Sequence, residues 1–79
     1  MTVRILFFGA TADETGNRVI DVVLDDNSNA QTAFEKILDQ FPQLKKHKLL
    51  FAVNQEYAAG QSRLNDGDEM AIFTAVSGG

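Results

Sequence analysis

The chain has 79 residues, a formal net charge of −4 and no cysteine. Its length suits a single domain, 1–79, with one hydrophobic core, and the lack of cysteine excludes a disulfide framework, a thiolate metal site and a thiol nucleophile. The acidic balance disfavours non-specific binding to nucleic acid and favours a partner with a basic surface. No apolar run approaches the roughly 18 residues of a membrane span, and Met1 is not followed by a signal-peptide pattern, so we expect a cytoplasmic protein with no membrane partner.

The N-terminal region predicts two strands joined by a loop. Alternating side chains in Thr2–Phe8 predict the first strand. One of its faces carries three apolar residues, Val3, Ile5 and Phe7. The other face carries Leu6 and Phe8, so this strand is either covered on both sides or meets a partner with its outer face. Residues 9–16 are predicted to form a loop, and Arg18–Leu24 a second strand that pairs with the first as an antiparallel hairpin.

One amphipathic helix is predicted next. Asp25–Asn29 is rich in residues that favour helix N-termini, and Ser28 with Gln31 resembles a capping box. Apolar residues then recur at helical spacing on one face, namely Ala30, Ala33, Phe34, Ile37, Leu38 and Phe41. Pro42 is expected to end the helix, because the residue before a proline disfavours the α conformation. We expect this apolar stripe to form the core with the sheet, and the helix to lead into a strand parallel to and beside the second strand.

The C-terminal half predicts three further strands. Leu49–Val53 forms the third strand, and Tyr57–Ala59 is expected to pair briefly. Asn65–Asp68 is a strong turn signal, and Met70–Val76 is predicted as the last strand. These elements predict an α+β domain with a mixed sheet of four to five strands and one main helix, which is the ubiquitin-like β-grasp architecture.

Two groups of polar residues are candidate sites, although a structural role is favoured for both. Gln43–Lys48 could form a basic patch for an acidic partner, but a solvated loop is the preferred interpretation. His47 is the only histidine and has no evident carboxylate neighbour, so no catalytic or metal role is expected. Asp66, Asp68 and Glu69 could bind a cation, yet Asp-Gly-Asp before a strand is typical of turn chemistry.

The sequence ends on a segment predicted to be a flexible tail, composed of Val76, Ser77, Gly78 and Gly79. Glycine has no Cβ, so other groups can approach its backbone closely. Four extended residues reach about 13–14 Å, enough to carry the Gly79 carboxylate into the active site of another protein. The alternative is an ordinary frayed terminus.

Four segments together resemble the MoaD-type sulfur carriers, which are the small subunits of molybdopterin synthase and belong to the ubiquitin-like β-grasp family. The segments are Ile5–Phe8, Ala52–Asn54 with Tyr57, Leu64–Glu69 and Val76–Gly79. The resemblance runs the whole length of the chain. There are two departures from the family's pattern: Thr74-Ala75 stands where prolines usually precede the tail, and Asp13 precedes Glu14 where the first loop often has Arg-Glu.

The resemblance implies a role as co-substrate and subunit rather than catalyst. An E1-like adenylyltransferase would use ATP and magnesium to convert the Gly79 carboxylate into an acyl-adenylate, and a sulfur donor enzyme would then replace AMP to leave a thiocarboxylate. The tail would enter the large subunit, in a heterotetramer, and that subunit would supply the catalytic residues. Sulfur would pass to a pterin precursor in molybdenum cofactor biosynthesis. The chain itself is expected to bind no cofactor and no metal.

Leu6, Phe8 and Phe73 are predicted to lie on the sheet face away from the helix and to form part of the partner surface. Three other functions remain open: a sulfur carrier for thiamin thiazole synthesis, a protein modifier conjugated to lysines through Gly79, and a binding module with an idle tail. What becomes attached to the carboxylate distinguishes them.

Overall fold

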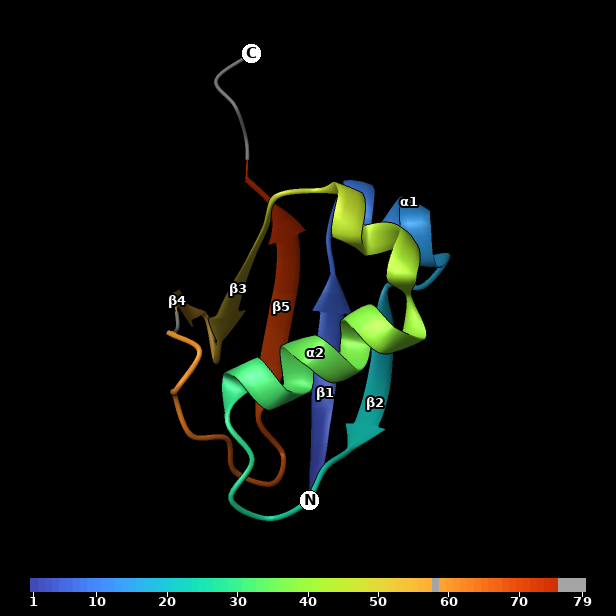
Figure 1. Ribbon diagram of the computed structural model, residues 1–79. Helices are drawn as coiled ribbons and strands as arrows, with labels where there is room; N and C mark the ends of the chain where they lie inside the picture. Colours follow the sequence, from blue (N-terminus) through green and yellow to red (C-terminus); the bar gives the residue numbers. More distant parts are fainter. Residues whose placement is uncertain (58, 76–79) are drawn as a thin grey trace.

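The computed structural model describes residues 1–57 and 59–75. Within these residues a five-stranded sheet is crossed on one face by one long helix (Figure 1). The strands are β1 (Thr2–Phe7), β2 (Val19–Val23), β3 (Leu49–Val53), β4 (Glu56–Tyr57) and β5 (Glu69–Thr74). The helices are α1 (Ala10–Thr15), α2 (Ala30–Gln40) and the 3-10 helix η1 (Pro42–Lys46).

The sheet has the strand order β2-β1-β5-β3-β4, with β1 and β5 parallel at its centre. The predicted antiparallel hairpin of the first two strands is confirmed. The predicted direction of the strand after α2 is confirmed, because β3 runs parallel to β2. Its predicted place beside β2 is wrong, because β1 and β5 lie between the two strands. β5 takes the central place because its fully buried Met70 and Ile72 complete the apolar layer beneath α2. This arrangement is the β-grasp fold that the sequence predicts.

The core lies between α2 and one face of the sheet. Its fully buried side chains include Val3, Ile5, Ala33, Ile37, Leu44, Met70 and Ile72. Two other residues of the predicted stripe, Phe34 and Leu38, are only partly buried and pack against the margin of this core. Phe34 reaches β3, where its ring centroid lies 5.1 Å from that of Phe51. Ile37 is therefore the centre of the helix stripe.

The start of α2 differs from the predicted capping box. Asn29 is the N-cap, and its side-chain oxygen accepts a hydrogen bond of 2.9 Å from the Thr32 amide. Ser28 instead donates its hydroxyl to the Asp25 carbonyl at 2.7 Å, while its own carbonyl accepts from the Leu64 amide. Ser28 is thus held in the preceding loop, which leaves capping to the next residue. The helix ends before Pro42, as predicted.

Two segments predicted as loops are short helices. The six residues of α1 are too few to show a helical repeat in sequence, and glycines with positive φ bound them, Gly9 at 57° and Gly16 at 70°. η1 replaces most of the solvated loop predicted at Gln43–Lys48, because Leu44 turns inward and is fully buried. Among the described residues, no helix combines the length and apolar character needed to cross a bilayer.

Candidate functional site

The sheet face opposite α2 carries no helix among the described elements and is here called the open face (Figure 1). Leu6 and Phe73 point to it, because their strand neighbours Phe7 and Ile72 are buried on the helix side. The structure thus places both residues on the face that the sequence predicts for them. Phe8, just beyond β1, is 53% exposed and lines a hollow together with Leu6 and Val19.

Strand pairing adds apolar residues that the sequence reasoning did not single out. Leu50 is paired with Phe73, and Val19 with Leu6, so each shares the open face with its partner. The Tyr57 ring contacts Phe73 edge-on, with 6.0 Å between the ring centroids. We call this group, Leu6, Phe8, Val19, Leu50, Tyr57 and Phe73, the apolar half of the open face. The sequence reasoning missed these residues because alternation within one strand does not show which strands are neighbours or which residues are paired across them.

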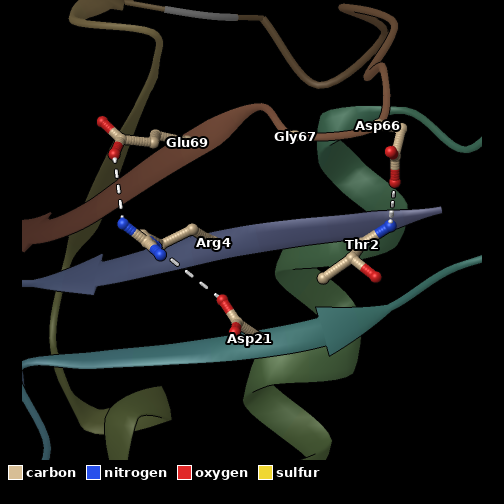
Figure 2. A pocket seen from close by; sticks show the side chains of 6 residues that line it. All are labelled: Thr2, Arg4, Asp21, Asp66, Gly67 and Glu69. Atoms are coloured by element: carbon tan, nitrogen blue, oxygen red, sulfur yellow. Dashed lines mark hydrogen bonds and ion pairs between the residues drawn. The ribbon is translucent and has the colours of Figure 1, made fainter.

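The other half of the open face is charged (Figure 2). Arg4 lies between Asp21, at 3.8 Å, and Glu69, at 4.0 Å. Asp66 closes the end of this half by accepting a 2.7 Å hydrogen bond from the Thr2 amide. Both ion pairs are exposed to solvent, so they add little to stability and stay available to a partner.

The carboxylates of the turn before β5 have structural partners, which confirms the turn interpretation. Asp68 accepts hydrogen bonds from the Asn65 amide at 2.7 Å and from the Asn54 side chain at 3.1 Å. Gly67, which lies between Asp66 and Asp68, has a φ of 86°, a conformation that glycine adopts readily. These acids therefore fix the turn that aligns β5 with β1.

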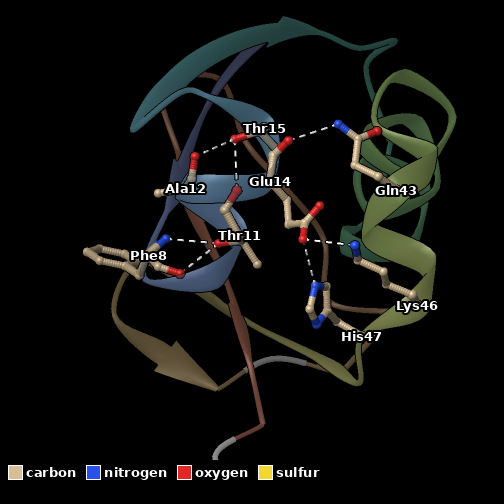
Figure 3. Close-up of polar contacts among 8 residues, drawn as sticks. All are labelled: Phe8, Thr11, Ala12, Glu14, Thr15, Gln43, Lys46 and His47. Atoms are coloured by element: carbon tan, nitrogen blue, oxygen red, sulfur yellow. Dashed lines mark hydrogen bonds and ion pairs between the residues drawn. The ribbon is translucent and has the colours of Figure 1, made fainter.

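A polar cluster joins α1 to η1 (Figure 3). Glu14 Oε1 lies 3.0 Å from Lys46 Nζ and 3.4 Å from His47 Nε2. Hydrogen bonds from Lys46 and then His47 lower the pKa of the Glu14 carboxyl, against a smaller opposing effect of desolvation. Gln43 adds a 2.9 Å hydrogen bond to the Glu14 backbone carbonyl. The expectation that His47 has no carboxylate neighbour is wrong, because η1 brings together residues that are far apart in sequence.

The described part of the chain ends just after β5. The Ala75 amide donates a 2.9 Å hydrogen bond to the Lys48 carbonyl, which continues the pairing of β5 with β3 by one residue. Proline at this position could not make that bond, since it has no N–H. The predicted tail residues, Val76, Ser77, Gly78 and Gly79, lie outside the described residues. β5 therefore ends beside the apolar half of the open face.

A sequence model described as the ThiS family matches residues 5–79. The chain belongs to the ThiS family. It is 34% identical to the molybdopterin synthase sulfur carrier subunit of Haemophilus influenzae over 80 residues, which cover 96% of this chain and 98% of the relative. This ThiS-family chain and its relative thus match over almost their full lengths.

Solved structures match the fold of this ThiS-family chain. The crystal structure of SAMP1 from Haloferax volcanii has a TM-score of 0.89 at 25% identity, with all of both chains covered. A chain from the complex of subunits 1 and 2 of the molybdopterin-converting factor of Helicobacter pylori has a TM-score of 0.70 at 23% identity, again with all of both chains covered. The second likeness concerns the fold alone.

Proposed function

We propose that this chain is the sulfur carrier subunit of a molybdopterin synthase. The observation that carries the proposal is the family match through residue 79, together with 34% identity to a named carrier subunit over nearly the whole chain. The matched region includes the diglycine Gly78-Gly79. The reaction would take place in the cytoplasm, in keeping with the composition of the chain.

The chemistry follows from the properties of a carboxylate. With a reference pKa of about 3.3–3.7, an α-carboxyl is ionised at neutral pH and is a poor electrophile. A Gly79 oxygen attacks the α-phosphorus of ATP on an E1-like enzyme that holds magnesium, and pyrophosphate leaves. Sulfide (HS⁻) delivered by a donor enzyme then attacks the acyl carbon, the bond from that carbon to the AMP oxygen breaks and AMP leaves, which yields the thiocarboxylate. The chain supplies the carrier group, while the enzyme partners supply ATP, magnesium and the catalytic side chains.

The proposed docking partner is the synthase large subunit, in a heterotetramer. The Helicobacter pylori structure with the same fold is a complex of subunit 1 with subunit 2, which supports a partner of this kind. The apolar half of the open face is suited to the contact, because aromatic side chains dominate interface energetics and Phe8 is exposed while Tyr57 is 79% exposed. In this arrangement Leu6, Phe8 and Phe73 anchor the subunit while the tail, Val76 to Gly79, enters the partner's active site.

A protein modifier is the second candidate. It is favoured by the likeness to SAMP1, a small archaeal modifier protein. A carrier for thiamin thiazole synthesis is the third candidate, because the family model that matches is the ThiS family. A modifier would join Gly79 to a lysine amine of another protein, whereas either carrier would bear sulfur.

The test is the fate of the Gly79 carboxylate. The chain ending at Gly79 is co-produced with its activating enzyme and sulfur donor, and its intact mass is measured. We expect the mass change of an oxygen-to-sulfur exchange, and conversion of the pterin precursor when the large subunit is added. A variant with one extra residue after Gly79 shifts the acyl carbon by about 3.3–3.6 Å and should give neither result, while it melts at the wild-type temperature. Masses that show the chain joined through Gly79 to other proteins, with no sulfur on the unconjugated chain, would overturn the proposal in favour of the modifier.

A further inference from the structure

The corner where the chain leaves β1 is built around one buried hydroxyl group. Thr11 has an exposed fraction of 0%, and its Oγ1 lies 3.0 Å from the Phe8 amide and 2.8 Å from the Phe8 carbonyl (Figure 3). The same oxygen lies 2.8 Å from the Ile72 carbonyl in β5. It accepts a hydrogen bond from the amide and shares its one proton between the two carbonyls.

This hydroxyl completes the pairing of β1 with β5. The paired residues of these strands reach Phe7 and Ile72, and the next backbone contact, from the Phe8 amide to the Ile72 carbonyl, is long at 3.4 Å. Thr11 supplies the shorter hydrogen bond to that carbonyl. One side chain therefore holds both backbone polar groups of Phe8 and ties them to β5, three residues before Ala75.

Two backbone hydrogen bonds also hold this corner, but both are longer: the Phe8 carbonyl accepts from the Thr11 amide at 3.2 Å, and the Phe8 amide donates to the Ile72 carbonyl at 3.4 Å. The Phe8 side chain is 53% exposed, so packing does not fix its position. Gly9, the next residue, has a φ of 57°, and its carbonyl accepts a 3.1 Å hydrogen bond from the Asp13 amide, so the backbone after Phe8 is held at the start of α1. The Thr11 hydroxyl thus makes the shorter hydrogen bonds, of 3.0 and 2.8 Å, among those that orient the Phe8 backbone.

We propose that Thr11 is a positioning residue for the partner surface. Its hydroxyl sets Phe8 at the margin of the apolar half and couples that aromatic anchor to the end of β5, which leads into the tail. The inference rests on the proposed function, in which Phe8 contacts the large subunit. Thr11 acts through Phe8 and does not itself touch the partner.

Two variants separate the hydroxyl from the shape of the side chain. Thr11→Val keeps the branched shape and removes the hydroxyl, whereas Thr11→Ser keeps the hydroxyl. We expect Thr11→Val to weaken binding of the large subunit about tenfold, the change that one ordinary hydrogen bond produces, and Thr11→Ser to stay within about twofold of wild type. In a Phe8→Ala background, Thr11→Val should cause no further loss of affinity. An equal loss in that background would show a merely structural role and overturn the proposal.

A second measurement needs no partner, so it separates failure of this inference from failure of the proposed function. In the free chain, Thr11→Val should speed hydrogen exchange of the Phe8 amide about tenfold while the Ile5 amide, in the middle of β1, keeps its wild-type rate. Unchanged exchange at Phe8 would refute the positioning role even if the large subunit binds. If Thr11→Val does not fold, the exchange rate of the Thr11 hydroxyl proton is measured in the wild-type chain instead. Exchange slower than that of the exposed Thr2 hydroxyl proton supports the proposal, and exchange at an equal rate overturns it.

Discussion

The two faces of the sheet use the same strands for different purposes. On the helix-covered face the inward side chains of β1 are all buried, and the core they form with α2 extends along the whole strand. The open face is divided into the apolar half near the end of β5 and the charged half around Arg4. A small domain can build its core from one face, which leaves the alternate residues free for recognition. Substitutions on the two faces should therefore separate stability from binding.

The largest effect is expected from Ile37→Ala on the covered face. Ile37 is fully buried at the centre of the helix stripe, so the variant should lose about 2–5 kcal/mol of unfolding free energy. Denaturant unfolding measures the loss, and the folded fraction should bind the large subunit with wild-type affinity. Leu38→Ala, one residue along, is the matched control and should cost less because Leu38 is only partly buried. Equal losses would mean that the stripe is centred elsewhere.

Phe8→Ala on the open face should do the reverse. We expect binding to the large subunit to weaken by about 2 kcal/mol, as for an aromatic anchor, while the unfolding free energy changes by less than about 0.5 kcal/mol. Titration calorimetry and denaturant unfolding give the two values. Val23→Thr is the control, because Val23 is 68% exposed on the same face but lies at the charged half. If Val23→Thr weakened binding as much as Phe8→Ala, the contact with the large subunit would extend over the whole open face.

The sequence predicted the covered face better than the open one. Alternation in β1 and the helical repeat in α2 identified the core residues, because burial imposes those periods. The contact between Glu14 and His47 was missed, since it depends on two helices that are each shorter than two full turns. The Thr11 hydrogen bonds were missed for the same reason, because they form where a short helix meets a strand distant in sequence. Local periodicity carries no information about such contacts.

Ala75→Pro tests how much the last hydrogen bond between β5 and β3 adds to stability. Proline removes the N–H that donates to the Lys48 carbonyl, so the variant should lose about 1 kcal/mol of unfolding free energy. Ala75→Ser keeps the donor and serves as control. Thermal melting measures the difference, and hydrogen exchange at the Thr74 amide should rise only in the proline variant. A proline variant as stable as wild type would show that this bond adds nothing to the pairing of β3 with β5.

Arg4→Gln probes the charged half, where the effect on stability should stay below about 0.5 kcal/mol because both ion pairs are exposed. Removing the Arg4 cation from beside Asp21, Asp66 and Glu69 makes this half more acidic. Given the net charge of −4, we expect the partner surface to be basic, so association should become faster at low salt and the difference should vanish at high salt. Stopped-flow association at several salt concentrations measures this, and slower association would mean that the partner presents an acidic surface to Arg4.

The smallest effect is expected away from both faces, at Glu14. Its carboxyl has a pKa lowered by hydrogen bonds from Lys46 and His47, so the folded state binds a proton less readily than the unfolded state. The resulting stability is present at pH above the usual carboxyl range of about 4.3, and it is lost as pH falls through the lower pKa of the folded state. The melting temperature of Glu14→Gln should therefore lie slightly below that of wild type at neutral pH, and the gap should close in acid. Asp13→Asn on the same helix matches the change in charge and should show a smaller pH-dependent gap. If the gap instead widened as the pH fell, the cluster would stabilise the protonated carboxyl, and the direction assigned to the Glu14 pKa would be wrong.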